Sequence, residues 1–429
     1  MTTVGKLDPT TAAAVATPIT ANRIEARCRS CDSKDLSVFL SLGDLPLSDG
    51  LLEAGQLVDN EPLYPLDVAF CASCSLVQIL ETVPPEELFG ADYPYFSSFT
   101  DTLLKHSEAN VKERIAERKL GATSLVVELA SNDGYLLQYY KANGVPVLGI
   151  DPAPGPVAAA RAKGVDTLQA FFGNDLAGKL VAQGRGADVI HANNVLAHVA
   201  DTNGFVEGIA TLLKDDGVAV IECPYVKDLI EHGEFDTIYH EHLCYFSVTA
   251  LRTLFRRHGL FITRVVPLSI HGGSLRVFVE KQNRPEHSVE QYIESEQRLG
   301  MDRLDYYADF SNRVTGIRSE LSQLLQGLKD RKARIVGYGA AAKGTIMLNY
   351  VGIGQETLDF VVDRNTHKQG RFIPGVRLPI ASPERVLAEQ PDYVLILPWN
   401  FKDEIMAQQA EYRRRGGKFI VPIPRPTII

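Results

Sequence analysis

The chain has 429 residues, of which 45% are hydrophobic and 23% are charged, and its formal net charge is −9. This length predicts two or three domains, and the acidic balance argues against a nucleic-acid-binding protein, which usually carries a basic surplus. No run of about 18 apolar residues occurs, so the sequence predicts no membrane span. Residues 1–24 are rich in Ala and Thr and lack the features of a signal peptide, so we expect a disordered tail on a cytoplasmic protein.

Four of the six cysteines form two Cys-x-x-Cys pairs separated by about forty residues. Each pair can place two thiolates on one metal ion, and four thiolates complete a tetrahedral zinc site. Because four cysteines leave no open coordination position, we expect a structural zinc, with four buried free thiols as the alternative. Cys223 and Cys244 are isolated, and we interpret each as a small core residue. The expected zinc ligands are Cys28, Cys31, Cys71 and Cys74.

From about residue 124 to residue 279, β-rich and helix-like segments alternate, which predicts a doubly wound, mainly parallel sheet. Such a sheet binds its ligand beyond the carboxyl ends of its strands. Glu128 lies directly before the first turn, and Asp151 ends the second strand, where an acid typically binds ribose hydroxyls. The expected strands span 124–129, 145–150, 187–191, 217–222, 261–266 and 274–280, and the first helix spans 135–142.

Small or turn-forming residues alternate in the segment 128–134, which lets the backbone pass close to a ligand. This segment resembles the first motif of the class I S-adenosylmethionine (SAM) methyltransferases, which is an acid followed by alternating glycines. Ala130 and Asn132 stand where glycines are usual, and an ordinary strand–turn–helix is the alternative. In the resemblance, the loop 193–198 packs beside the adenosine and the methyl donor. The resemblance implies these cofactor-binding residues: Glu128, Ala130, Asn132, Asp133, Gly134, Asp151, Pro152, Phe172, Asn193 and Asn194.

The densest group of reactive side chains is Tyr239-His240-Glu241-His242. A helical backbone would place Tyr239 and His242 on one face, whereas an extended backbone would place His240 and His242 together. Carbon methylation beside a ketone needs a base that forms an enolate, and histidine suits that role near neutral pH. A phenol can relay the proton, and Glu241 can orient the imidazole. Oxygen methylation could use the same base, and the histidines could instead bind a metal or serve only the fold.

The last part of the chain predicts a second nucleotide-type fold. Residues 286–330 have the pattern of a long helical connector, and the expected strand 333–336 leads into a small-residue loop that begins at Gly337. Such a loop before a helix binds phosphate, and Lys343 would add positive charge. The spacing to Asp363, after a strand at 358–362, also matches a nicotinamide dinucleotide site, which makes a dehydrogenase with a structural zinc the main rival hypothesis.

The order of these motifs, from the cysteine pairs to Trp399-Asn400, resembles the three-domain C-methyltransferases of deoxysugar biosynthesis. The resemblance implies that Tyr239, Glu241 and His242 are catalytic, while the role of His240 stays open. It also implies that the last fold holds the nucleoside diphosphate of the sugar. The members of the family differ in the carbon that they methylate, commonly C-3 or C-5. The implied or expected substrate-binding residues are Tyr93, His198, His271, Gly337, Gly339, Lys343, Asp363, Trp399 and Asn400.

We therefore expect an α/β protein with a zinc-binding domain (25–90), a class I methyltransferase domain (91–285), a helical connector (286–330) and a Rossmann-like nucleotide-sugar-binding domain (331–429). Its expected activity is SAM-dependent methylation, through an enolate, of the carbon beside the ketone of a nucleotide-linked (dTDP-) 4-keto-6-deoxysugar in natural-product biosynthesis. The base is His242, with Tyr239 as the alternative. We favour a monomer with no nucleic-acid or membrane partner. The alternatives are an NAD-dependent dehydrogenase, an O- or N-methyltransferase, and a non-enzymatic zinc-ribbon adaptor.

Overall fold

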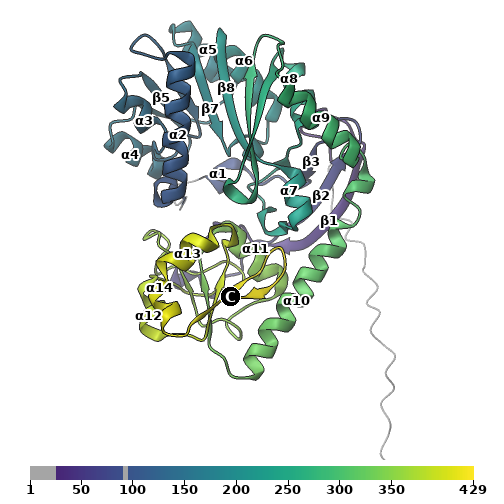
Figure 1. Cartoon of the computed structure of the whole chain (residues 1–429), viewed down its shortest axis with the longest axis vertical. Coiled ribbons are helices and arrows are strands. Elements are labelled where there is room, and N and C mark those ends of the chain that lie inside the picture. Colours follow the sequence, from purple (N-terminus) through teal and green to yellow (C-terminus); the bar gives the residue numbers. More distant parts are fainter. Residues whose placement is uncertain (1–25, 90–94) are drawn as a thin grey trace, which may run out of the picture.

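The computed structural model describes residues 26–89 and 95–429, arranged around three sheets (Figure 1). The expected tail at 1–24 and Tyr93 lie outside the described residues, as does the side chain of His271. Within the described residues, no helix is both long enough and apolar enough to cross a bilayer. The expected domain limits stay predictions.

The first sheet joins the N-terminal segment to the middle of the chain. Its order is β1-β2-β3-β9, and all its pairs are antiparallel. The buried side chains of Leu66, Val68 and Phe70 alternate along β2 and supply its core face. β9 begins at Cys244, two residues after the end of the Tyr-His-Glu-His stretch, so this sheet holds the end of that stretch in place. The strands are β1 (Leu36–Leu45), β2 (Tyr64–Cys71), β3 (Val77–Ile79) and β9 (Cys244–Tyr245), and α1 spans Pro85–Leu88.

The second sheet has seven strands in the order β10-β11-β8-β7-β4-β5-β6. The pairs from β8 to β6 are parallel, and β11 and β10 extend the sheet with antiparallel pairs. The strands are β4 (Val126–Leu129), β5 (Val147–Asp151), β6 (Thr167–Gln169), β7 (Ala187–Asn193), β8 (Leu213–Pro224), β10 (Phe261–Leu268) and β11 (Ser274–Glu280). The helices are α2 (Asp101–Arg118), α3 (Leu137–Ala142), α4 (Pro154–Ala162), α5 (Asn174–Ala182), α6 (Thr202–Leu212), α7 (Val226–His232) and α8 (Val248–Arg257).

The connector consists of two helices, α9 (His287–Leu299) and α10 (Phe310–Asp330). Gly300 takes a φ of 77°, a left-handed conformation that ends α9 and suits glycine. The segment after it, up to residue 309, forms only turns and a short 3₁₀ helix. Phe39 of β1 packs against Phe310, at the start of α10, so the connector also supports the first sheet.

The third sheet, with the order β14-β13-β12-β15-β16-β17, is parallel up to β16 and antiparallel at β17. The N-terminal segment touches this domain, because Thr345 Oγ1 donates to the carbonyl of Ser48 over 3.0 Å. The strands are β12 (Ile335–Tyr338), β13 (Val361–Val362), β14 (Ile380–Ala381), β15 (Tyr393–Ile396), β16 (Lys418–Val421) and β17 (Thr427–Ile428). The helices are α11 (Ala342–Val351), α12 (Glu384–Glu389), α13 (Lys402–Gln408) and α14 (Ala410–Arg414).

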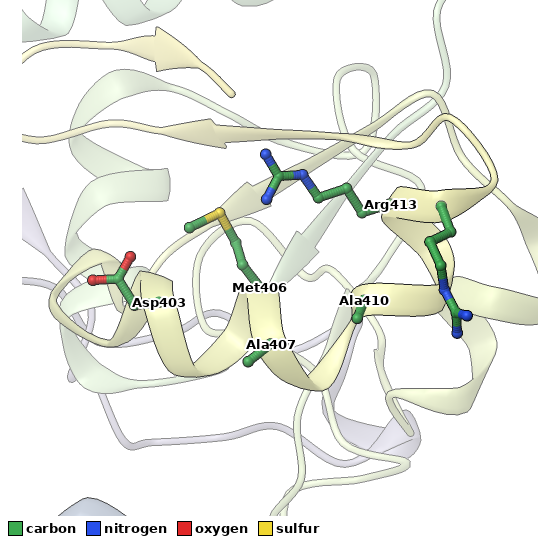
Figure 2. Close-up of a pocket in the computed structure, with 6 residues that line it drawn as sticks. Asp403, Met406, Ala407, Ala410 and Arg413 are labelled. Carbon is green, nitrogen blue, oxygen red and sulfur yellow. The ribbon is translucent and has the colours of Figure 1, made fainter.

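A hollow of about 610 Å³ lies along α13 and α14 (Figure 2). Its lining contains none of the residues that the sequence marks as candidates for catalysis or binding. It is lined by Asp403, Met406, Ala407, Ala410, Arg413 and Arg414.

Candidate functional site

The four paired cysteines meet at one point beside the first sheet. Their sulfur atoms all lie within 4.8 Å of one another, and two of the Sγ–Sγ distances, Cys28–Cys74 and Cys31–Cys71, are 3.5 Å. A tetrahedral zinc with bonds of about 2.3 Å places its sulfur ligands about 3.8 Å apart, so this cluster fits the ion. Among the described residues, these cysteines are the group of metal-binding side chains that converges in this way.

The loop between β4 and α3 keeps the backbone of a glycine-rich loop without most of its glycines. Ala130, Asn132 and Gly134 have φ values of 55°, 48° and 75°, so all three are left-handed. This conformation costs an ordinary L-residue about 1–2 kcal/mol, and asparagine tolerates it better than alanine. The loop therefore retains the shape that alternating glycines usually provide.

Buried polar atoms gather around this loop without a well-formed hydrogen bond among the described residues, although the hydroxyl of Tyr135 lies close to both Glu128 and Asn193. They are both carboxylate oxygens of Glu128, Ser131 Oγ, Asp133 Oδ1 and Asn193 Oδ1. Burial raises the pKa of Glu128 well above its usual range. Buried polar groups in native proteins are almost always paired, so this set fits a ligand with several hydroxyl and amino groups, such as SAM.

The other cofactor candidates support the loop or border it. Asp151 accepts the amides of Asn132 and Ala153, each over 2.9 Å, so both of its oxygens hold backbone. Burial raises the pKa of Asp151 to about 6. Asp133 Oδ2 lies 3.0 Å from Lys163 Nζ. Pro152 follows β5, Asn194 follows β7, and half-buried Phe172 packs edge-on against Phe205 of α6.

Tyr239 and His242 form a close pair at a turn, with ring centroids 3.9 Å apart. His242 Nδ1 lies 2.7 Å from the carbonyl of Thr237, which can only accept, so this nitrogen carries the proton. Nε2 is then the acceptor, and the hydroxyl of Tyr239 donates to it over 2.8 Å. Of the two arrangements that the sequence allows, the helix-like one with Tyr239 beside His242 is present.

The histidines near this pair have different surroundings. The ring of His198 stands edge-on to His242 at 4.6 Å, and burial lowers the pKa of His198 to about 4, so it is neutral. His240 turns away from the pair, and its Nε2 donates to the carbonyls of Tyr64 and Pro65 at 3.1 and 3.3 Å. His240 therefore ties the stretch to β2.

Two charged residues near Glu241 were not found from the sequence. Lys368 and Asp49 form a buried ion pair at 3.3 Å, and Lys368 also donates to the carbonyl of Ala340. Burial raises the pKa of Glu241 well above its usual range, and Asp49 adds to that effect while Lys368 opposes it. Asp49 and Lys368 are 319 residues apart in the chain, so no local sequence pattern indicates that they meet.

In the last domain, neighbouring side chains of the same domain fill the space beside the glycines of the loop. A side chain at Gly339 would collide with Pro398, and a Cβ at Gly337 would lie 2.8 Å from Val361. Asp363 accepts the amides of Ala340 and Asn365, each over 2.7 Å.

The remaining candidates of this domain face the methyltransferase fold. Trp399 donates its indole N–H to Asp236 over 2.8 Å, just before the Tyr-His-Glu-His stretch. Lys343 lies over the Trp399 ring and donates to Asn400.

Three family models match successive parts of the chain: a zinc binding domain (residues 28–89), a methyltransferase domain (104–265) and a C-methyltransferase C-terminal domain (269–424). The C-methyltransferase NovU of Streptomyces niveus is 34% identical over 407 residues, which cover 94% of this chain and 96% of that protein. This chain belongs to the C-methyltransferase family.

The family membership confirms a SAM-dependent C-methyltransferase with a structural zinc, and it decides against the dehydrogenase and adaptor hypotheses. Solved structures give weaker matches. Magnesium protoporphyrin IX methyltransferase from Synechocystis is 14% identical and covers 46% of this chain and 88% of its own, with a TM-score of 0.33. A SAM-dependent methyltransferase from Clostridium acetobutylicum is 14% identical and covers 41% and 91%, with a TM-score of 0.34.

Proposed function

We propose that this C-methyltransferase methylates the carbon beside the ketone of a nucleoside-diphosphate-linked 4-keto-6-deoxysugar, such as a dTDP-sugar. The observation that carries the proposal is the Tyr239–His242 pair, whose hydrogen bonds define one donor and one acceptor. A ketone makes the adjacent C–H acidic enough for such a pair to remove its proton. The pair follows β8 and η4 (Phe235–Thr237). The loop 130–136 after β4, here called the donor loop, and the buried polar atoms around it lie at the carboxyl ends of β4 and β7, which belong to the same sheet as β8.

In the proposed mechanism, His242 is the base and Tyr239 relays the proton. Burial raises the pKa of Tyr239 well above its usual range, so the phenol keeps its proton until His242 accepts it. The substrate proton passes to the Tyr239 oxygen while the hydroxyl proton moves to His242 Nε2, which leaves an enolate on the sugar. Bound SAM would supply an electrophilic methyl group: the enolate carbon would bond to it as the methyl–sulfur bond of the sulfonium breaks, and S-adenosylhomocysteine would leave. The proton on His242 is then released to water.

The surroundings of the pair favour this step. His198 is neutral, so the positive charge that forms on His242 meets no like charge from that ring. The Nδ1–H of His242 points at the Thr237 carbonyl, which stabilises the imidazolium and holds its orientation. Glu241 and the Asp49–Lys368 ion pair bring ionisable groups from three parts of the chain toward the same place.

The sugar nucleotide is proposed to bind against the last domain, near the glycine loop, with Lys343 as its positive charge. Lys343 is held by Asn400 and by the Trp399 ring at 4.7 Å, so its ammonium group is already positioned. Gly337, Gly339 and Asp363 shape this loop, and Trp399, which lies under Lys343, donates to Asp236.

Product identification tests the proposal. The purified enzyme is incubated with ¹³C-methyl-labelled SAM and a panel of dTDP-4-keto-6-deoxysugars. We expect NMR to find the label on a carbon adjacent to the ketone, and mass spectrometry to find one added methyl group. A label on oxygen, or no transfer to any sugar of the panel while another acceptor is methylated, would refute the proposed substrate.

A further inference from the structure

The side chain of Asn132 forms hydrogen bonds to a neighbouring segment of the chain. Its Oδ1 accepts the amide of Ser97 over 2.9 Å, and its Nδ2 donates to the carbonyl of Tyr95 over 3.1 Å. Asn132 and Ser97 are both buried. A glycine at position 132 would keep the left-handed backbone and lose both hydrogen bonds.

The segment that Asn132 holds, residues 95–102, also contacts the last domain; we call it the strap. Phe96 stacks on His367 with ring centroids 4.6 Å apart and an interplanar angle of 13°. Thr102 donates to Glu404 over 2.7 Å. The strap therefore touches the donor loop on one side and the proposed sugar-nucleotide domain on the other.

We propose that Asn132 is a positioning residue that couples SAM binding to sugar-nucleotide binding through the strap. A ligand that fixes the donor loop also fixes the two hydrogen bonds of Asn132, and through them the strap that stacks on His367. The second ligand then binds to a protein that is already ordered, which is positive coupling between the two sites. The inference rests on the proposed function, because it takes the last domain as the acceptor site.

The test measures the affinity of S-adenosylhomocysteine by calorimetry with and without saturating dTDP. The ratio of the two dissociation constants is the coupling factor, and we expect about fivefold or more in the wild-type enzyme. In Asn132→Gly the factor should fall to about one, and the KM for the sugar nucleotide should rise more than kcat falls. Ala130→Gly is the matched control, since it adds a glycine at the other left-handed position of the loop that has a side chain, without removing a strap contact.

Ser97→Pro tests the same contact from the other side. It removes the amide that Asn132 accepts, at the first residue of the 3₁₀ helix η2 (Ser97–Phe99), where proline is tolerated after the extended Phe96. Its coupling factor should also approach one, and combining it with Asn132→Gly should add little.

The outcomes separate the two proposals. If wild-type enzyme does not bind dTDP at all, the proposed acceptor site fails and the inference fails with it. If both ligands bind and the coupling factor is about one in wild type, only the inference is overturned. The inference is also overturned if coupling survives in Asn132→Gly, or, where that variant does not fold, in Ser97→Pro. It is likewise overturned if Ala130→Gly loses coupling to the same extent as Asn132→Gly.

Discussion

The loops after β4 and β12 both match a nucleotide-binding strand–loop–helix pattern in the sequence, yet they differ in whether the polar side chains around them are hydrogen-bonded. The segment 128–134 contains one glycine, whereas the segment 337–342 contains two. The acid at or just after the end of the next strand does the same work in both units, because Asp151 and Asp363 each accept two backbone amides. The units differ one strand earlier. Glu128, the penultimate residue of β4, has a carboxylate without a well-formed hydrogen bond, whereas Gly337, at the corresponding position of β12, is packed against Val361.

The difference teaches that glycine content reports on backbone conformation and packing, while unpartnered buried polar atoms report on a ligand. Ala130 and Asn132 reach left-handed φ values without being glycines, and the glycines at 337 and 339 are required by their neighbours in the fold. The glycine-poor loop is therefore the better candidate for the donor site. Three experiments test this comparison.

The largest expected effect is on kcat, in a variant that lacks the proposed base and keeps the donor site. His242→Ala is expected to lower kcat by about 10²–10⁴-fold, because it removes a general base, while the dissociation constant of SAM changes by no more than about twofold. Steady-state kinetics and calorimetry measure the two quantities. His287→Ala, on an exposed histidine at the start of α9, is the matched control. A loss of kcat below tenfold would exclude His242 as the base.

A second experiment addresses the two loops directly. Glu128→Gln should raise the dissociation constant of SAM by roughly 10–100-fold, because an oxygen that can accept from ligand hydroxyls is replaced by an amide that can only donate. Asp363→Asn should leave SAM affinity within about twofold and cost stability instead, since one amide of the loop loses its acceptor. Calorimetry and thermal unfolding are run on both variants. If Asp363→Asn weakens SAM binding and Glu128→Gln costs only stability, the comparison between the loops is wrong.

Much of the fold follows from local patterns, and the exceptions are short or non-local. The expected strand 274–280 coincides with β11, because its run of apolar β-formers is long enough to be clear. β6 and β9 have only three and two residues, so no periodicity reveals them. The expected connector at 286–330 is divided at Gly300, which ends a helix by its left-handed φ.

In the candidate site, too, the sequence identifies some features and leaves others open. Its reactive residues stand out by type, yet their pairing depends on a backbone that the sequence leaves open. Tyr239 meets His242 because a turn brings residues three apart together, and His240 is drawn to β2 by strand carbonyls from a distant segment. The Asp49–Lys368 ion pair joins segments 319 residues apart and depends wholly on tertiary packing.

The smallest effect concerns Asp151, which supports the donor loop as Asp363 supports the loop after β12. Burial raises the pKa of Asp151 from 3.8 to about 6, so the folded chain holds this proton more tightly than the unfolded chain does. Without ligand, its contribution to stability is therefore greatest below about pH 4 and is lost as the pH rises to about 6.

Asp151→Asn should remove that part of the pH dependence. Relative to wild type, the free energy of unfolding of the variant should rise between pH 4 and pH 7, by at most about 3 kcal/mol. Urea unfolding of the apo protein at both pH values measures the difference, and the other buried acids cancel because both proteins contain them. Asp302→Asn, on an exposed residue, changes the net charge equally and serves as the control. An Asp151→Asn difference that is the same at both pH values would mean that Asp151 is ionised throughout, held as an anion by its two backbone amides.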